Sequence, residues 1–220
     1  MRLLVKKWAG NGGATRDRLL FAGIGEFSRE GFAGANTARI VAAAGCNVRM
    51  IYHYFGSKMG LYRACLERVY VDLRDAEEAL NLDEADPRGS IARFVAFTFD
   101  YMLDHPEFPR MMRVENLNEG RAVREIASVV ESARPLMRRL DGLVRAGNRQ
   151  GLFPRLVPPE HLYLNILGLS FVHISNFHTA SVMLQLDFQA PAFRETRRRE
   201  AIDLVLASLE TPARDGSHAG

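Results

Sequence analysis

The 220-residue sequence has few of the features that mark secreted or membrane-spanning proteins. It contains two cysteines, Cys46 and Cys65, which are too few for a disulfide framework. No stretch approaches the ~20 consecutive apolar residues that a membrane-spanning helix needs. Residues 1–8 are basic and apolar but have no long hydrophobic region and no small-residue cleavage site, unlike a signal peptide. We therefore expect a soluble, cytoplasmic protein.

The sequence also lacks the motifs of common enzyme classes. It shows no Ser-His-acid spacing and no glycine-rich phosphate loop. Gly23 and Gly25 fall within a helical pattern without a third glycine, so they form no dinucleotide fingerprint; they predict close approach of the helix that carries Ile40. His173 and His178 have no cysteine or carboxylate cluster to complete a metal site. We expect no catalytic residues, no metal and no cofactor.

Long runs of alternating apolar and polar residues, which would predict a sheet, are absent too. Apolar residues make up 47% of the chain and recur at helical spacing. The fold class is therefore predicted as all-α, with a small N-terminal three-helix domain followed by a larger helical domain. The predicted helices cover residues 15–30, 36–44, 48–55, 59–80, 91–104 (capped by Ser90), 108–117, 122–149 (kinked or broken at Pro135), 160–184 and 193–209.

Charge is unevenly distributed along the chain. Residues 1–63 contain ten Lys and Arg against three Asp and Glu, a net charge of +7. Residues 64–220 contain nineteen against twenty-three, a net charge of −4. A basic part joined to a mildly acidic part is typical of a protein that contacts phosphates with one end. An anionic membrane surface would attract the same charge, but no long basic amphipathic helix supports that alternative.

Residues 36–58 predict two short helices joined by a tight turn. Asn36 is a good N-cap because its side-chain oxygen can accept hydrogen bonds from open N–H groups of the first turn. Gly45 permits the left-handed backbone that ends a helix. Asn47 is a second plausible cap, and Ile51 lies on the apolar side of the helix that follows. The pattern is that of a helix-turn-helix, whose second helix enters the major groove of DNA.

The second helix of this motif carries polar and apolar side chains suited to a duplex. Polar side chains can hydrogen-bond to base edges or phosphates, and apolar ones can contact thymine methyl groups. The predicted base-reading residues are Asn47, Val48, Arg49 and Met50, the predicted phosphate contacts are Tyr52, His53 and Lys58, and Asn36 and Thr37 complete the predicted DNA-binding set. The basic arm, residues 1–13, is a candidate for further backbone contacts. A helical hairpin with polar residues facing water is the alternative.

Residues 15–69 resemble the DNA-binding domain of the TetR family of transcriptional repressors. The most specific part is the spacing Tyr-x-x-Phe-x-x-Lys-x-x-Leu, formed by Tyr52, Phe55, Lys58 and Leu61. The sequence departs from the family at Asn36, Val41 and residues 47–49, and the last departure is expected to change which bases are read. Residues 113–121 are faintly similar to the RutR branch of the family, which does not identify a ligand.

The resemblance implies a homodimeric repressor that binds a palindromic double-stranded DNA operator and is released by a small-molecule effector. The predicted domains are a flexible basic arm (1–13), a DNA-binding domain (14–63), an effector-binding and dimerisation domain (64–210) and a disordered tail (211–220). A helical enzyme assembled from distant residues and a protein-interaction module without DNA binding are the alternatives.

The apolar stretch from residue 162 to 186 covers more than one face of a helix, and such a helix must be buried on two sides. The last predicted helix has apolar residues at near-heptad spacing. A two-fold four-helix interface would bury both helices, and internal burial in a monomer is the alternative. The predicted interface residues are Leu162, Ile166, Leu169, Ala201, Leu204, Val205 and Ser208.

The larger domain also has aromatic and methionine side chains suited to an effector cavity, because methionine adapts to irregular guests and a few polar groups can orient a ligand. The predicted pocket residues are Phe94, Phe97, Met102, Met111, Met112, Asn116, Phe171, His173 and Phe177. For each of them, an ordinary place in the core is the alternative.

Overall fold

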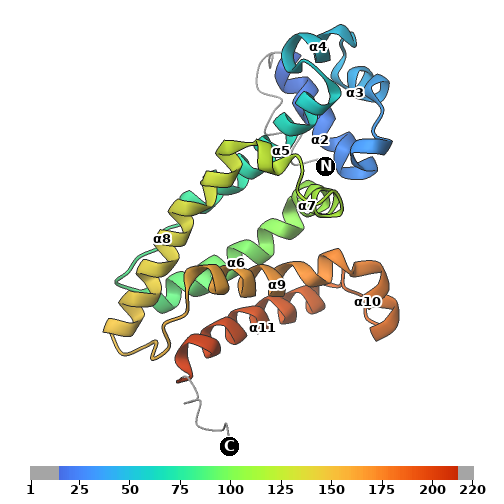
Figure 1. Ribbon diagram of the computed structural model, residues 1–220. Helices are drawn as coiled ribbons and strands as arrows, with labels where there is room; N and C mark the ends of the chain where they lie inside the picture. Colours follow the sequence, from blue (N-terminus) through green and yellow to red (C-terminus); the bar gives the residue numbers. More distant parts are fainter. Residues whose placement is uncertain (1–14, 213–220) are drawn as a thin grey trace, which may run out of the picture. The chain divides into compact units, whose positions relative to one another are not determined.

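The computed structural model describes residues 15–212, so our predictions for the arm and for residues 213–220 of the tail lie outside the described residues. The described chain forms α-helices and one short 3-10 helix and contains no strand (Figure 1). The all-α prediction is confirmed. The elements are α2 (Thr15–Gly34), α3 (Thr37–Ala44), α4 (Arg49–Phe55), α5 (Lys58–Glu78), α6 (Pro87–Asp104), α7 (Glu107–Leu117), η1 (Val123–Glu125), α8 (Ala127–Arg149), α9 (Pro159–Ser175), α10 (Phe177–Leu184) and α11 (Pro191–Glu210).

The described residues divide into two compact units. The first unit comprises residues 15–72 and Arg110–Glu131, and the second comprises Leu73–Pro109 and residues 132–212. The segment Arg110–Glu131 therefore belongs with the N-terminal helices, although the sequence placed it in the larger domain. Helical spacing alone does not reveal such a grouping, because it depends on which elements pack together.

Local hydrogen bonds and backbone angles define both ends of α3, as predicted, whereas the N-cap of α4 is Val48 and not Asn47. The Asn36 side-chain oxygen accepts from the Ala38 N–H at 2.8 Å. Gly45 adopts the left-handed backbone (φ 62°, ψ 43°) and ends α3. The Asn47 side-chain oxygen accepts from the Arg49 N–H at 2.9 Å. The helix-turn-helix is thus built by side chains that satisfy the open N–H groups beside them.

The predicted cap of α6 is wrong. This helix begins at Pro87, and the Asp86 carboxylate accepts from the Gly89 N–H at 3.0 Å. The Ser90 hydroxyl instead donates to the Asp83 carbonyl at 3.0 Å. Proline suits the first helical turn because its missing N–H would have no intrahelical acceptor there.

Two other predictions concern the interior of long helices. We expected a kink or a break at Pro135, but α8 continues through this residue, and the chain breaks instead at Ile126, between η1 and α8. A proline removes one hydrogen bond but does not always end a long helix. The helix predicted over residues 160–184 is interrupted at Asn176, which separates α9 from α10.

The core of the second unit is formed by α6, α8, α9 and α11, and α9 lies beside α11 (Figure 1). Four residues predicted for the dimer interface belong to this core. Leu162, Ile166 and Ala201 are fully buried, and Val205 is 2% exposed. These four assignments are corrected, because side chains buried inside one chain are not available to a second copy. Of the remaining three, Leu204 is exposed and Leu169 and Ser208 are half-buried.

The two glycines of α2 differ in their surroundings. A Cβ atom at Gly23 would lie 2.8 Å from the Cys65 Sγ of α5, whereas one at Gly25 would meet no atom within 4 Å. Helix α2 does pack against α3, which bears Ile40, but not through these glycines: the close neighbour at Gly23 is α5, and Gly25 has none.

This difference predicts opposite effects of the same substitution. Gly25→Ala is expected to raise the free energy of unfolding by up to ~1 kcal/mol, because alanine loses less backbone entropy in a helix. Gly23→Ala is expected to lower it by about 1–3 kcal/mol through overpacking against Cys65. Urea unfolding followed by circular dichroism would measure both, and equal effects of the two variants would contradict this packing.

Candidate nucleic-acid interface

Helix α4 is anchored by one side chain and turns most of the others outward. Ile51 is 1% exposed, whereas Tyr52 is 61% exposed. Of the predicted DNA-binding residues, Asn36, Asn47, Val48, Arg49, Tyr52 and His53 are exposed, and Thr37, Met50 and Lys58 are half-buried. A helix held from one side in this way can present its outer face to a duplex.

Two predicted contact residues have a structural role as well. The side-chain oxygens of Asn36 and Asn47 accept from backbone N–H groups at the start of α3 and α4. An amide side chain that uses its oxygen as a cap keeps its two N–H donors, which can still reach an acceptor on DNA. Arg49 differs from them, because it makes no ion pair with any other described residue. Its guanidinium keeps all its donors for a partner.

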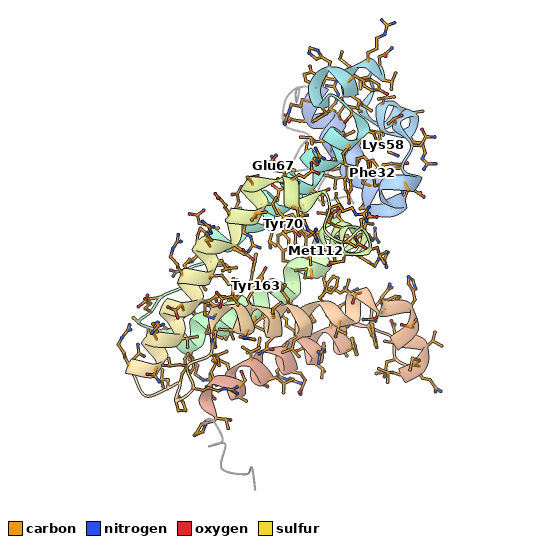
Figure 2. All side chains as sticks on the ribbon, viewed as in Figure 1. Phe32, Lys58, Glu67, Tyr70, Met112 and Tyr163 are labelled. Carbon is orange, nitrogen blue, oxygen red and sulfur yellow. The ribbon has the colours of Figure 1, made fainter. Side chains whose placement is uncertain are left out.

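Lys58 stands at the first residue of α5, with its ammonium over an aromatic ring. The Nζ atom lies 4.9 Å from the centroid of the Phe32 ring (both residues are labelled in Figure 2). An aromatic face attracts the cation without neutralising its charge. The Ser57 hydroxyl caps the same turn by accepting from the Gly60 N–H at 3.0 Å. The charge of Lys58 is thus held in place and stays available to a phosphate.

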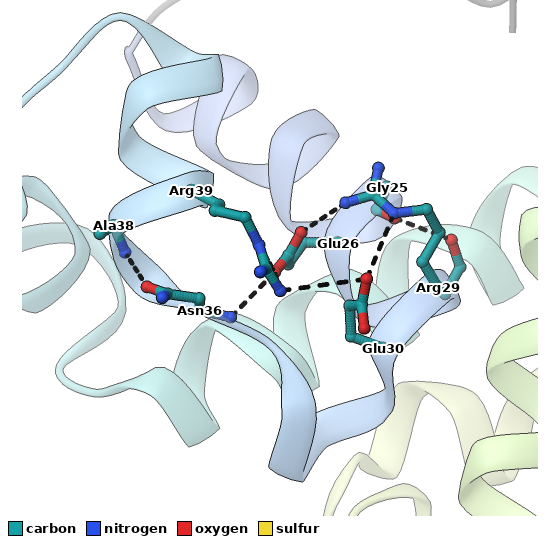
Figure 3. Close-up of polar contacts among 8 residues, drawn as sticks. Gly25, Glu26, Arg29, Glu30, Asn36, Ala38 and Arg39 are labelled. Atoms are coloured by element: carbon teal, nitrogen blue, oxygen red, sulfur yellow. Dashed lines mark hydrogen bonds and ion pairs between the residues drawn. The ribbon is translucent and has the colours of Figure 1, made fainter.

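A buried carboxylate fixes the start of α3, and the sequence analysis missed it. Glu26 of α2 is 4% exposed and accepts from the Asn36 N–H at 2.9 Å and from the Arg39 Nε at 2.7 Å (Figure 3). Arg29 donates to it at 2.6 Å. Burial acts to raise the pKa of Glu26, but these hydrogen bonds and the charges of Arg39 and Arg29 lower it below its ordinary value. The ionised carboxylate therefore ties α2 to the first turn of α3.

A signal for Glu26 was present in the sequence. It lies three residues after Gly23 and beside Phe27, on the face of α2 that is otherwise apolar. A charged residue on a buried face needs partners, because an unpaired buried charge is costly. Which partners it has was not visible, since Arg39 is thirteen residues away along the chain.

The predicted effector-pocket residues are divided between the two units. Met111, Met112 and Asn116 belong to the first unit, whereas Phe94, Phe97, Met102, Phe171, His173 and Phe177 belong to the second. Asn116 is exposed and donates to the Met112 carbonyl at 2.9 Å, so its assignment to a buried pocket is corrected. A surface hollow of about 370 Å³ in the second unit is lined by other residues: Arg155, Leu156, Val157, Pro158, His161, Asn165 and Ser208.

Comparison with known proteins identifies the family. Residues 19–65 match the family model of bacterial regulatory proteins of the tetR family, and residues 87–205 match that of the tetracyclin repressor-like C-terminal domain. The chain is 39% identical over 173 residues to the HTH-type transcriptional repressor NicS of Pseudomonas putida, covering 79% of this chain and 82% of NicS. This chain belongs to the TetR family.

Other similar proteins are also transcriptional regulators by name. The HTH-type transcriptional repressor SCO4008 of Streptomyces coelicolor is 34% identical over 152 residues, covering 69% of this chain and 74% of SCO4008. The crystal structure of the transcriptional regulator SCO4942 from Streptomyces coelicolor matches with a TM-score of 0.67 and 26% identity, covering 90% of this chain and all of SCO4942. RutR of Escherichia coli O157:H7 is 25% identical over 169 residues, a likeness that singles out no ligand.

The family membership and the exposed helix-turn-helix together make this TetR-family protein a DNA-binding transcriptional regulator. The recognition of the family from the motif of Tyr52 to Leu61 is confirmed. Within the part of the chain that the structure describes, no helix has the length and apolar character required to cross a membrane.

Proposed function

We propose that this TetR-family regulator is a homodimeric repressor that binds a palindromic operator through α3 and α4 and is released by a small-molecule effector bound in its second unit. The observation that carries the proposal is α4 itself, which is anchored by Ile51 and exposes Arg49 and Tyr52. The printed names of NicS and SCO4008, both transcriptional repressors, support repression.

On this proposal Arg49 reads bases. Arg49→Ala is expected to weaken binding to the best operator by about 1–3 kcal/mol, or roughly 5- to 150-fold in Kd, since a bidentate contact to guanine is lost. The variant should no longer discriminate at one base pair of each half-site. On duplexes in which that base pair is already changed, the substitution should reduce affinity only slightly. Fluorescence anisotropy on a panel of single-base operator variants would measure it. An equal loss on every duplex would make Arg49 a backbone contact.

Lys58, by contrast, is assigned to a phosphate. Lys58→Ala is expected to weaken binding to all duplexes alike and to reduce the slope of log K against log salt by about one unit, because one fewer counterion is released. Anisotropy at several salt concentrations would measure the slope. Arg134→Ala, which removes an exposed charge from α8, is the matched control and should leave the slope unchanged. An unchanged slope in Lys58→Ala would remove Lys58 from the phosphate contacts.

The proposed dimer surface is revised toward the exposed apolar residues of the second unit. Leu164 and Val172 of α9 are 62% and 47% exposed, and Leu204 of α11 is 50% exposed. On α10, Met183 is 80% exposed. Exposed apolar side chains on neighbouring helices favour burial against a partner, and a two-fold pairing of α9 and α11 would cover them with the same surface of a second copy.

Release by an effector is proposed as thermodynamic linkage. An effector that prefers the conformation unfit for the operator weakens DNA binding by the same factor by which DNA weakens effector binding. Phe94, Phe97, Met102, Phe171, His173 and Phe177 stay as proposed pocket residues of the second unit, and Met111 and Met112 as proposed residues of the first.

The experiment that tests the proposal is selection of genomic DNA fragments by the purified protein near physiological salt, followed by sizing of the complex on the selected site. One palindromic site bound by two chains would support the homodimeric repressor. Recovery of nothing above background, repeated after unfolding, dialysis and refolding to remove any bound ligand, would refute operator binding.

A further inference from the structure

A cluster of charged and polar side chains in the second unit has buried Glu77 at its centre and three partly buried neighbours. Arg74 and Glu77 come from α5, Arg139 from α8 and Tyr163 from α9 (Tyr163 is labelled in Figure 2). The side chains of Arg74 and Glu77 are 16% and 4% exposed. Arg74 pairs with Glu77 through one terminal nitrogen and donates to the Tyr163 hydroxyl through the other at 3.3 Å. Side chains of α5 and α9 thus meet at one guanidinium.

Two donors of this cluster have no acceptor. The Arg74 Nε–H is buried and makes no hydrogen bond to any described residue. The Tyr163 hydroxyl accepts the bond from Arg74, which leaves its own proton without an acceptor among the described residues. Proteins rarely leave buried donors unpaired, and such a group calls for an explanation. The ion pair between Arg74 and Glu77 does not explain the unpaired Nε–H, because Glu77 contacts a terminal nitrogen of Arg74 and not Nε.

The cluster also has an excess of positive charge. Arg139 donates to the carbonyl oxygens of Glu77 and Leu80, at 3.0 and 2.8 Å, so its charge meets backbone dipoles rather than a second carboxylate. Two guanidinium groups therefore face the single carboxylate of Glu77. Burial raises the pKa of Glu77 above its ordinary value, although Arg74 and Arg139 act in the opposite direction. The two guanidinium groups would attract a second carboxylate, and burial would oppose it as it opposes the ionised form of Glu77.

Aromatic rings border the cluster. The Arg74 guanidinium lies 5.8 Å from the centroid of the Tyr163 ring, and the Phe94 ring lies 6.4 Å from that ring. Phe94 is fully buried. Aromatic side chains thus lie next to the charged groups, and such surroundings would suit a small acid with an apolar body.

We propose that Arg74 and Tyr163 bind the carboxylate of a small organic acid, and that this acid is the effector. The carboxylate would accept from the Arg74 Nε–H and the Tyr163 hydroxyl, the two donors that lack acceptors, and arginine suits carboxylates because its donors form a planar fork. The identification with the effector rests on the proposed function. One helix could couple acid binding to DNA binding, because α5 carries both Arg74, near its end, and Lys58, at its first residue.

The test uses the full chain and three probe acids, benzoate, phenylacetate and cyclohexanecarboxylate, each beside its uncharged amide. Binding is measured by calorimetry and by the shift in Tm. We expect at least one acid to bind and its amide to bind roughly tenfold or more weakly, because a charge-assisted hydrogen bond is replaced by a neutral one. Arg74→Gln and Tyr163→Phe should each reduce this preference for the acid. Arg145→Gln, which removes an exposed, paired arginine of α8, should leave it unchanged.

Three results would overturn the proposal. No acid binds at millimolar concentration, acids and amides bind alike, or the Arg74→Gln variant prefers the acid to its amide as strongly as the Arg145→Gln control does. If Arg74→Gln unfolds, Tyr163→Phe alone decides, because removing one hydroxyl leaves the core otherwise filled. Operator binding is measured separately. A bound acid that leaves operator affinity unchanged overturns the effector assignment but not the acid site, and failure to find any operator refutes the repressor while the acid-binding result still holds.

Discussion

Replacing Glu115 by Ala is expected to lower the free energy of unfolding by about 3 kcal/mol or more. Glu115 of α7 is 4% exposed, and its carboxylate serves three donors of the first unit. One oxygen accepts from the Tyr62 hydroxyl at 3.0 Å, and the other accepts from the N–H groups of Ala122 and Val123 at 2.6 and 3.1 Å. Each donor left without an acceptor costs roughly 1–3 kcal/mol when it is buried.

The interaction with Tyr62 can be isolated. Burial and the hydrogen bond to Glu115 raise the pKa of the Tyr62 hydroxyl, so it keeps its proton and donates. Tyr62→Phe should therefore cost about 1 kcal/mol on its own, and less when Glu115 is already alanine, which a double-mutant cycle would detect.

Urea unfolding followed by circular dichroism would measure these variants. Glu131→Ala removes an exposed carboxylate of α8 and should change stability by no more than about 0.5 kcal/mol. A loss in Glu115→Ala no larger than in Glu131→Ala would show that the hydrogen bonds of Glu115 do not hold α7 and η1 to α5.

Ile51→Ala should have the second large effect, and it should reach DNA binding. Ile51 is the one buried residue of α4, a helix of seven residues. Truncating a fully buried isoleucine costs about 2–5 kcal/mol. A helix this short is not stable without packing, so we expect α4 to lose its fixed position and operator affinity to fall on all sequences.

Two matched variants separate the role of this anchor from that of the exposed face. Ile51→Val should cost only about 0.5–1.5 kcal/mol. Tyr52→Ala, at a residue that is 61% exposed, should leave stability within about 0.5 kcal/mol while weakening DNA binding. Unfolding in urea and anisotropy with a labelled operator would measure the three variants together. Normal operator affinity in Ile51→Ala would mean that α4 is held by something other than Ile51.

The features that could be predicted from the sequence are those with local causes. Asn36 caps α3, the Asn47 side chain accepts from the Arg49 N–H just before α4, and Gly45 ends α3 through its own backbone angles. Helical spacing of apolar residues placed Ile51 on a buried face. The helix-turn-helix followed from interactions that span a few residues, and the family followed from the resemblance of the motif from Tyr52 to Leu61.

The partners of buried groups could not be predicted in this way. An apolar face must be covered, but spacing does not say whether the cover comes from the same chain or from a second copy. This is why Leu162, Ile166, Ala201 and Val205 were assigned to an interface and proved to be core. Buried polar groups were missed for the same reason.

The sequence by itself therefore determined the all-α class and the turn that presents α4, because caps, turns and helical periodicity act between neighbouring residues, and its motif resembled that of the TetR family. The tertiary structure alone decided which distant groups meet: Glu26 with Arg39, Tyr62 with Glu115, and Arg74 with Tyr163. Such pairs lie 13 to 89 residues apart. Their energies arise from burial and from satisfied hydrogen bonds, which exist only once the helices have packed.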